Sequence, residues 1–164
     1  MIIFVKNKHT LQIDEFKFKC CVGKKGSTNN KIEGDGKTPR GTFEIGNLYF
    51  RKDRIKKPLT SLKCVEIRKD MGWCDDVSYP KKYNKLFKIK KGIKHEKLKR
   101  KDYKYDLLVP IKYNFKKPIT GRGSCIFIHL TKDYKPTAGC IALRKKDFLI
   151  LLRLIKKGSK IKIC

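Results

Sequence analysis

Apolar and polar residues alternate over short stretches along most of this chain, a pattern typical of half-buried β-strands. Near the N-terminus the alternation predicts strands at Ile2–Val5, Thr10–Ile13 and Phe16–Cys20. Further strands are predicted at Thr42–Ile45, Leu62–Ile67, Tyr105–Ile111, Gly123–Leu130 and Ser159–Cys164. Between them, residues 23–41 read as a long loop rich in Gly, Asn, Ser and Thr, and residues 69–84 read as irregular.

One segment has helical spacing, and it predicts a helix over Arg144–Lys157. Asp147 lies in the first turn, and Lys156-Lys157-Gly158 ends the pattern. The apolar face consists of Phe148, Leu151, Leu152 and Ile155. With 164 residues the chain falls in the range of one domain. The sequence therefore predicts a single domain over residues 1–164, mainly β (a β-rich α+β fold), with one helix near the C-terminus.

The net charge of +28 favours an anionic partner such as nucleic acid, anionic lipid or an anionic cell wall. However, 35 of the 43 basic residues are Lys, whereas Arg is the preferred reader of bases. This composition favours a solvated lysine-rich surface over a sequence-specific reader. Twelve basic residues lie in Lys81–Lys104, interleaved with apolar ones, so this run is predicted to be ordered. Residues 71–80 and 121–130 contain no Lys, and we expect any site built there to lie apart from the run.

Several protein classes are disfavoured by what the chain lacks. The longest apolar runs, such as Phe148–Leu152, are far shorter than the roughly 18 residues that span a bilayer, so no transmembrane segment is predicted. The N-terminal residues carry no recognisable export signal. Seven Cys without a CxxC pair argue against a zinc ribbon and against a complete disulfide framework.

Of the three histidines, His9 and His95 are predicted to be solvated surface residues. His129 instead ends an apolar strand on which Cys125 and Phe127 share its face. On a strand, the Cα atoms of Cys125 and His129 would lie about 13 Å apart, too far to share one zinc ion. The sequence therefore predicts no metal site there.

After His129 come a loop of about ten residues and the pair Gly139-Cys140, which leads into another apolar run. This order can bring an imidazole next to a thiol. The imidazole can take the thiol proton and later return it to a leaving group. The N–H groups of Gly139 and Cys140 are candidates to bind an oxyanion. Spacing alone leaves open the alternative of a core Cys and an unrelated His.

Five segments in a fixed order carry a resemblance to a known family. They are Glu33–Phe43; Gly72–Asp76 with Tyr83-Asn84; Tyr105-Asp106 with Tyr113-Asn114; Gly121–His129; and Pro136–Leu143. In these segments the chain resembles the L,D-transpeptidase (YkuD-like) family. The resemblance implies a mainly β sandwich-like catalytic domain with a C-terminal helix packed on it, Cys140 as nucleophile and His129 as base.

The resemblance also implies a reaction. Members of the family transfer acyl groups between peptidoglycan stem peptides through a cysteine thioester, forming 3→3 crosslinks, and no ATP, metal or other cofactor is implied. The chain departs from the family pattern at Ala138, where a second His is usual, and at Ala142, where Arg or Asn is frequent. These departures concern substrate contacts more than the nucleophile.

Further residues are candidates for the substrate site. Gly139 and Thr137 flank the nucleophile, while Arg122 and the pair Asp75/Asp76 offer charges that match the carboxylates and amines of a stem peptide. The alternative is that Arg122 caps a strand entry and the Asp pair forms a turn. Trp73 is predicted to be a core residue, and Thr38–Gly41 a tight structural turn.

Three functions remain open from the sequence. The first is L,D-transpeptidation of peptidoglycan, with an anionic cell-wall surface as a further partner. The second is hydrolysis through the same thioester, as a carboxypeptidase or amidase, and the third is non-enzymatic binding of nucleic acid. The resemblance implies the periplasm or cell envelope, whereas the missing export signal leaves a cytoplasmic location open.

Overall fold

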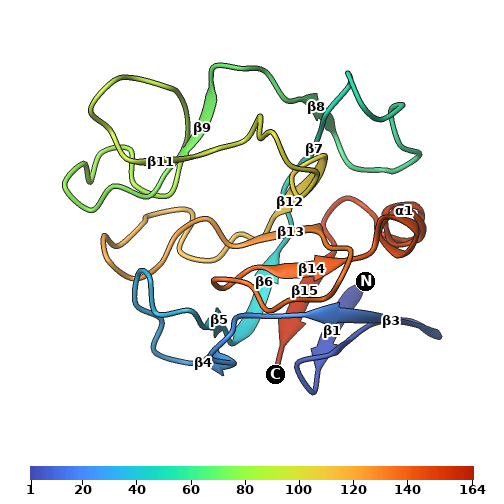
Figure 1. Cartoon of the computed structure of the whole chain (residues 1–164). Helices are drawn as coiled ribbons and strands as arrows, with labels where there is room; N and C mark the ends of the chain where they lie inside the picture. The colour runs from blue at the N-terminus through green and yellow to red at the C-terminus, as the bar shows by residue number, and fades with distance from the viewer.

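The computed structural model describes residues 1–164, and its main element is a curled sheet of ten strands (Figure 1). In spatial order these strands are β6 (Gly41–Glu44), β15 (Lys160–Ile163), β1 (Ile2–Lys6), β2 (Thr10–Ile13), β3 (Phe16–Cys21), β14 (Ile141–Leu143), β13 (Phe127–Leu130), β12 (Leu107–Pro110), β7 (Leu48–Phe50) and β8 (Cys64–Glu66). Most neighbours are antiparallel; β1–β15, β13–β14 and β7–β8 are parallel. The sheet therefore joins the first and last strands of the chain.

Two smaller sheets lie beside the large one. In the first, β9 (Met71–Cys74) pairs with β10 (Leu86–Lys88) and β11 (His95–Lys97). We call residues 71–104, which contain this sheet, the lysine-rich lobe; β9 and β11 lie at the upper left of Figure 1. The second sheet pairs β4 (Ser27–Thr28) with β5 (Thr38–Pro39) inside the predicted long loop. The run Lys81–Lys104 is ordered, as predicted.

The central strands separate two apolar cores. Along β13, Ile128 belongs to a large core of 26 residues, whereas Phe127 belongs to a second core of nine. Successive side chains of a strand point to opposite faces, so β13 is covered on both sides. The second core also contains Trp73, which is 3% exposed and donates its indole N–H to Asn84 Oδ1 at 2.9 Å. The prediction that Trp73 is a core residue is confirmed.

The single helix, α1 (Lys145–Leu154), packs Phe148, Leu151 and Leu152 into the large core. It ends before the predicted Lys157, because Ile155 adopts extended backbone (φ −71°, ψ 143°) and buries its own side chain in that core. The predicted fold class, mainly β with one C-terminal helix, is confirmed. No helix has the length and apolar character that crossing a membrane requires.

Several predicted strands differ from the structure; the strand predicted at Leu62–Ile67, for example, covers only Cys64–Glu66. The strand predicted at Gly123–Leu130 begins only at Phe127, because Gly123 and Cys125 have φ values of +96° and +55°, outside the extended region. Cys125 is therefore not on a strand face shared with Phe127 and His129. The predicted strand Tyr105–Ile111 is shorter, at Leu107–Pro110. Residues 69–84, predicted to be irregular, contain β9, whose four residues are all buried and show no alternation.

Candidate active site

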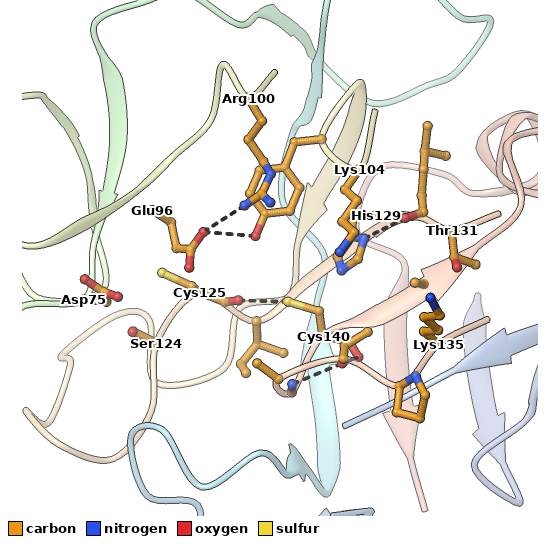
Figure 2. A pocket seen from close by; sticks show the side chains of 18 of the residues that line it. Asp75, Glu96, Arg100, Lys104, Ser124, Cys125, His129, Thr131, Lys135 and Cys140 are labelled. Carbon is orange, nitrogen blue, oxygen red and sulfur yellow. Dashed lines mark hydrogen bonds and ion pairs between the residues drawn. The ribbon is translucent and has the colours of Figure 1, made fainter. Parts of the chain in front are cut away.

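A pocket of about 550 Å³ lies between the large sheet and the lysine-rich lobe (Figure 2). The sheet side contributes Cys140 and His129 to its lining, and the lobe contributes Asp75, Glu96 and Arg100. The pocket thus joins segments that are distant in the sequence. Of the predicted candidates, Thr137 and Gly139 also line it.

The parallel pairing of β13 with β14 brings His129 and Cys140 together. Ile128 lies opposite Ile141, and His129 lies opposite Ala142, so Cys140 is two residues from the partner of His129. With a rise of about 3.3 Å per residue and strands about 4.8 Å apart, the two Cα atoms are roughly 8 Å apart on the same face. Figure 2 shows the two side chains on one wall of the pocket. The imidazole and the thiol therefore face a common space.

Two threonines hold the Gly139-Cys140 turn. The Thr137 hydroxyl donates to the Cys140 carbonyl at 2.6 Å and accepts the Gly139 N–H at 3.1 Å. The Thr38 hydroxyl donates to the Gly139 carbonyl at 2.9 Å. Because the Gly139 N–H already has a partner, it is not a free oxyanion donor, contrary to the sequence-based expectation. The Cys140 N–H makes no hydrogen bond and remains the free donor.

The backbone conformation of this turn and the closeness of a neighbouring loop require glycine at position 139. Its φ is +150°, and a Cβ there would lie 2.9 Å from the Lys37 carbonyl oxygen. A side chain at this position would therefore force the turn and the loop that carries Lys37 apart.

The surroundings of His129 determine its tautomer and its charge. Its Nδ1 lies 3.0 Å from the Leu130 carbonyl oxygen, which can only accept, so Nδ1 carries the proton and Nε2 has a free lone pair. Burial lowers the pKa of His129 to about 4, with a further lowering by the charges of Lys104 and Arg100. The imidazole is therefore neutral at pH 7 and able to accept a proton at Nε2.

Cys140 is a buried thiol with two polar contacts. Its Sγ donates to the Cys125 carbonyl at 3.1 Å and accepts the Phe127 N–H at 3.4 Å. Burial raises the pKa of the Cys140 thiol to about 12. No hydrogen bond joins Cys140 to His129. The resting pair is thus a neutral thiol and a neutral imidazole.

Three groups on the opposite wall were not predicted from the sequence. The Arg100 guanidinium lies 4.9 Å from the centre of the Tyr105 ring and 3.6 Å from the Glu96 carboxylate. The Tyr105 hydroxyl donates to Glu96 at 3.4 Å, and its ring contacts the His129 ring at 5.5 Å. Glu96 could have been noticed, because it is one of only two acids in a run of twelve bases.

The expectation that the lysine run lies apart from this site was wrong for three residues. Glu96, Arg100 and Lys104 all line the pocket. The reason is that the lysine-rich lobe folds against the sheet, a tertiary arrangement that linear charge density does not reveal. The remaining lysines of the run lie outside the pocket lining.

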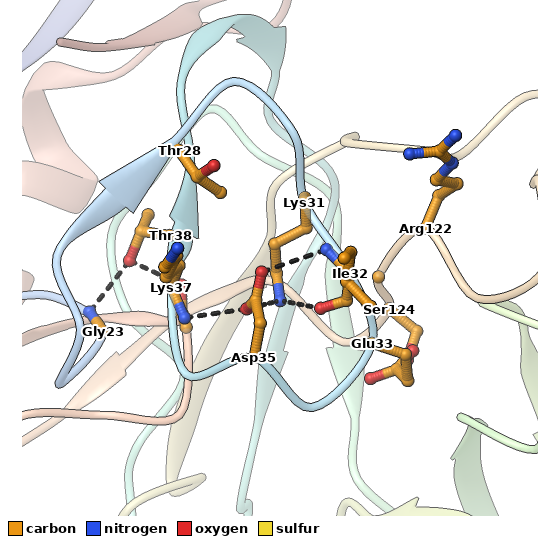
Figure 3. Close-up of polar contacts among 12 residues, drawn as sticks. Gly23, Thr28, Lys31, Ile32, Glu33, Asp35, Lys37, Thr38, Arg122 and Ser124 are labelled. Atoms are coloured by element: carbon orange, nitrogen blue, oxygen red, sulfur yellow. Dashed lines mark hydrogen bonds and ion pairs between the residues drawn. The ribbon is translucent and has the colours of Figure 1, made fainter.

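The loop between β4 and β5 forms a third wall (Figure 3). Lys31, 4% exposed, pairs with Asp35 and also donates to the Ile32 carbonyl, while Asp35 accepts the Lys37 N–H at 2.8 Å. These bonds shape the loop and present Glu33 to the pocket. The burial and the bonding of Thr38 agree with the structural role predicted for Thr38–Gly41.

Glu33 is bound to neighbouring segments by neutral hydroxyl groups. Its Oε2 accepts hydrogen bonds from the Tyr83 hydroxyl and, at 2.7 Å, from the Ser124 hydroxyl. Tyr83 is fully buried and its hydroxyl also accepts the Gly123 N–H at 3.1 Å. One acid thereby links the loop, the lysine-rich lobe and the segment before β13.

The remaining predicted candidates are divided between the pocket and its surroundings. Asp75 lines the pocket, whereas Arg122 and Asp76 do not. Asp76 accepts the Ser78 N–H and the Lys94 N–H, as expected for a residue that shapes a turn. Arg122 is exposed.

The two other histidines differ from each other. His9 is exposed, as predicted. The same prediction for His95 was wrong: its ring packs against Phe87, and its Nε2 is buried without a partner. No group of three or more His, Cys, Asp or Glu side chains is placed to hold a metal ion.

Comparison with known proteins agrees with this fold. The chain resembles the helical cell shape determining protein Pgp2 from Campylobacter jejuni, with 19% identity, a TM-score of 0.54, and coverage of 99% of this chain and 46% of that one. It also resembles Bd1075 from Bdellovibrio bacteriovorus, with 18% identity, a TM-score of 0.52, and coverage of 99% and 47%. The chain thus spans about half the length of these proteins. No curated protein sequence matches significantly.

The model of one protein family, the L,D-transpeptidase catalytic domain (YkuD), matches residues 1–163. This match covers nearly the whole chain, including the β13–β14 pair, the Gly139-Cys140 turn and the lysine-rich lobe. The chain belongs to the L,D-transpeptidase catalytic domain family.

Proposed function

We propose that residues 1–164 form one catalytic domain that acts on peptidoglycan stem peptides through a thioester at Cys140. In the first step, His129 Nε2 takes the proton of the Cys140 thiol as Sγ attacks the carbonyl carbon at the L-centre of a donor peptide. A C–S bond forms, and the carbonyl oxygen becomes an oxyanion next to the free N–H of Cys140. Collapse breaks the C–N bond, and the His129 imidazolium gives its proton to the departing amine.

The second step returns the enzyme to its starting state. An amine of another stem peptide attacks the thioester carbon and gives a proton to His129 Nε2. The new C–N bond forms, the C–S bond breaks, and the thiolate recovers its proton from His129. The product is a 3→3 crosslink. Water in place of the amine would give hydrolysis by the same steps, the reaction of a carboxypeptidase or amidase.

The observation that carries this proposal is the arrangement of His129 and Cys140 around one pocket. The imidazole is neutral, its Nδ1 proton is bound to Leu130, and its free Nε2 shares the pocket with the thiol. Both groups rest uncharged, so we expect proton transfer to accompany the attack and not to precede it. Membership of the family supports peptidoglycan as the substrate and the cell envelope as the place of action.

Acylation by a carbapenem tests the nucleophile. Intact-mass measurement should find one covalent adduct on the wild type and none on Cys140→Ala. Cys64→Ala is the matched control, because this half-buried thiol lies outside the pocket lining and its loss should leave the adduct in place. An adduct that persists in Cys140→Ala would move the nucleophile to another cysteine.

Incubation with a tetrapeptide then separates the two outcomes of the thioester. With an added acceptor peptide, transpeptidation yields a crosslinked dimer, whereas hydrolysis yields only the shortened peptide. Mass spectrometry of the products distinguishes them. Failure of both reactions in a protein that still reacts with the carbapenem would contradict the proposed substrate.

A further inference from the structure

One short segment of backbone before and at the start of β13 holds the Cys140 sulfur. The Sγ–H donates to the Cys125 carbonyl at 3.1 Å, and Sγ accepts the Phe127 N–H at 3.4 Å. Figure 2 shows the contact with the Cys125 carbonyl as a dashed line. His129 makes no hydrogen bond to the thiol. The position of the segment Cys125–Phe127 therefore determines where the resting sulfur lies in the pocket.

Cys125 adopts a backbone conformation that is uncommon for its residue type. Its φ is +55°, in the left-handed region that favours glycine and asparagine. Such a conformation persists where the surrounding structure holds it. The Cys125 N–H donates to Asn84 Oδ1 at 3.1 Å, whereas the Cys125 side chain makes only a weak contact, from Sγ to the Trp73 carbonyl at 3.8 Å. The bond to Asn84 thus anchors the residue whose carbonyl holds Cys140.

Asn84 is itself held in a single orientation. It is 3% exposed, and its Oδ1 also accepts the Trp73 indole N–H at 2.9 Å. Its Nδ2 donates to the carbonyls of Tyr113 and Asn114 at 3.0 Å and 2.7 Å. An amide side chain can make four hydrogen bonds of this kind, and Asn84 makes all four. Because two N–H donors lie on one side and two carbonyls on the other, the amide cannot be reversed.

We propose that Asn84 is a positioning residue for the nucleophile: by holding the Cys125 N–H, it sets the Cys125 carbonyl that orients the Sγ–H of Cys140. Asn84 does not line the pocket, so it acts on the chemistry only through Cys125. The inference rests on the proposed function, in which Cys140 is the nucleophile. When the thiol proton moves from the Cys125 carbonyl to His129 Nε2, the Phe127 N–H remains as a donor to the thiolate.

Infrared spectroscopy tests the thiol hydrogen bond in the wild type. The S–H stretching band of a thiol moves to lower wavenumber when the thiol donates a hydrogen bond. The difference between the wild type and Cys140→Ala isolates the band of Cys140 from those of the other six cysteines. We expect this band below that of a small alkanethiol in an apolar solvent, whose S–H is free. A Cys140 band at the position of the free thiol would overturn the inference.

Asn84→Gly tests the anchor. Glycine suits the φ of +53° at this position, and each variant is compared with the same variant carrying Cys140→Ala. The Cys140 band should move up toward that of the free thiol. The maximal rate of carbapenem acylation should fall about 3- to 10-fold, the range for loss of a neutral hydrogen bond. The carbapenem concentration at half this rate should not change, because Asn84 lies outside the pocket lining.

Asn114→Gly is the matched control. Asn114 also has a positive φ, +47°, and its side chain binds the backbone of Ile119 and Gly123 with no bond to Cys125. Gly123 keeps its bond to the Tyr83 hydroxyl in this variant. The Cys140 band and the acylation rate should therefore stay as in the wild type.

The outcomes separate this inference from the proposed function. A band that does not move in Asn84→Gly, or a band that moves without slower acylation, would overturn the inference. If Asn84→Gly fails to fold, hydrogen exchange of the wild type decides: the Cys125 amide should be protected, and exchange as fast as in an unfolded peptide would overturn the inference. A wild type that forms no carbapenem adduct would contradict the proposed function, while the infrared bands would still test how the thiol is held.

Discussion

At the residue scale, burial decides the resting charge of His129 and Cys140. Burial disfavours the charged forms of both, so it lowers the pKa of the imidazole to about 4 and raises that of the thiol to about 12. The resting pair is therefore not a preformed thiolate–imidazolium. The His129 imidazole stays unprotonated well below pH 7.

The pH dependence of acylation follows from the low pKa of His129. The carbapenem acylation rate should stay high as the pH falls through 6.5, the ordinary value for His, and should decline only near pH 4. His129→Gln should lower the rate by about 10²–10⁴ and remove this decline. Stopped-flow or mass-based rates between pH 3.5 and 8 (about the range where native protein is expected) provide the measurement. A decline centred at 6.5 would show that the imidazole is solvated.

The same shift makes stability depend on pH. In the unfolded state His129 becomes protonated as the pH falls below 6.5. In the folded state it becomes protonated only near pH 4. The stabilising contribution of the neutral histidine is therefore complete above pH 6.5 and is lost as the pH falls to about 4. Urea unfolding midpoints should decrease less over this window in His129→Gln than in the wild type. An equal decrease in both would contradict the assignment.

At the element scale, the parallel β13–β14 pair and the loops on either side assemble the site. The Gly139-Cys140 turn is bound to Thr137 within its own connection and to Thr38 from the distant β5. The loop carrying Glu33 is bound to Tyr83 and Ser124. These hydrogen bonds hold the turn and the loop in place at the pocket.

Gly139→Ala tests the turn. The added Cβ would meet the Lys37 carbonyl at 2.9 Å on a backbone with φ +150°, so we expect a loss of about 1–3 kcal/mol in the free energy of unfolding and of most acylation. Gly121→Ala is the control, because Gly121 also has positive φ but an added Cβ meets nothing within 4 Å. Equal losses in the two variants would mean that the contact with Lys37 is unimportant. Chemical denaturation and adduct formation provide the two readouts.

Tyr83→Phe tests the link through Glu33. Removal of the hydroxyl leaves the Gly123 N–H without its partner and takes one donor from Glu33, so the variant should lose about 1–3 kcal/mol of stability. Tyr79→Phe serves as the control, since Tyr79 is exposed and its hydroxyl makes no hydrogen bond. Urea denaturation measures both variants. No difference between them would show that the buried network adds nothing to stability.

At the scale of the whole molecule, the charge of +28 and the pocket act on different steps. Exposed charges attract a polyanion over a range of about 8–10 Å at physiological salt. Lys85, Lys88, Lys90 and Lys91 are exposed and lie outside the pocket lining. We propose that these lysines promote the encounter with an anionic wall surface and leave the chemical step to the pocket.

Replacement of these four lysines by Gln should weaken binding to sacculi at low salt, with little effect at high salt. Turnover of a soluble tetrapeptide should not change. The same replacement at four exposed lysines outside the lobe, Lys17, Lys156, Lys157 and Lys162, tests whether position matters beyond total charge. Retention of a particular nucleic acid sequence at high salt would instead favour the nucleic-acid-binding alternative.

The sequence by itself determined the local features of this protein. Alternation and helical spacing are properties of neighbouring residues, so they predicted the N-terminal strands, the helix face at Phe148 and Leu151, and the order of His129 and Cys140. Only the tertiary structure decided what depends on contacts between distant segments. Examples are the hydrogen bond from the Cys125 N–H to Asn84, the bond from the Thr38 hydroxyl to the Gly139 carbonyl, and the folding of the lobe that brings Glu96, Arg100 and Lys104 into the pocket. Burial also lowers the pKa of His129 and raises that of Cys140. This burial arises from packing against residues that no local pattern reveals.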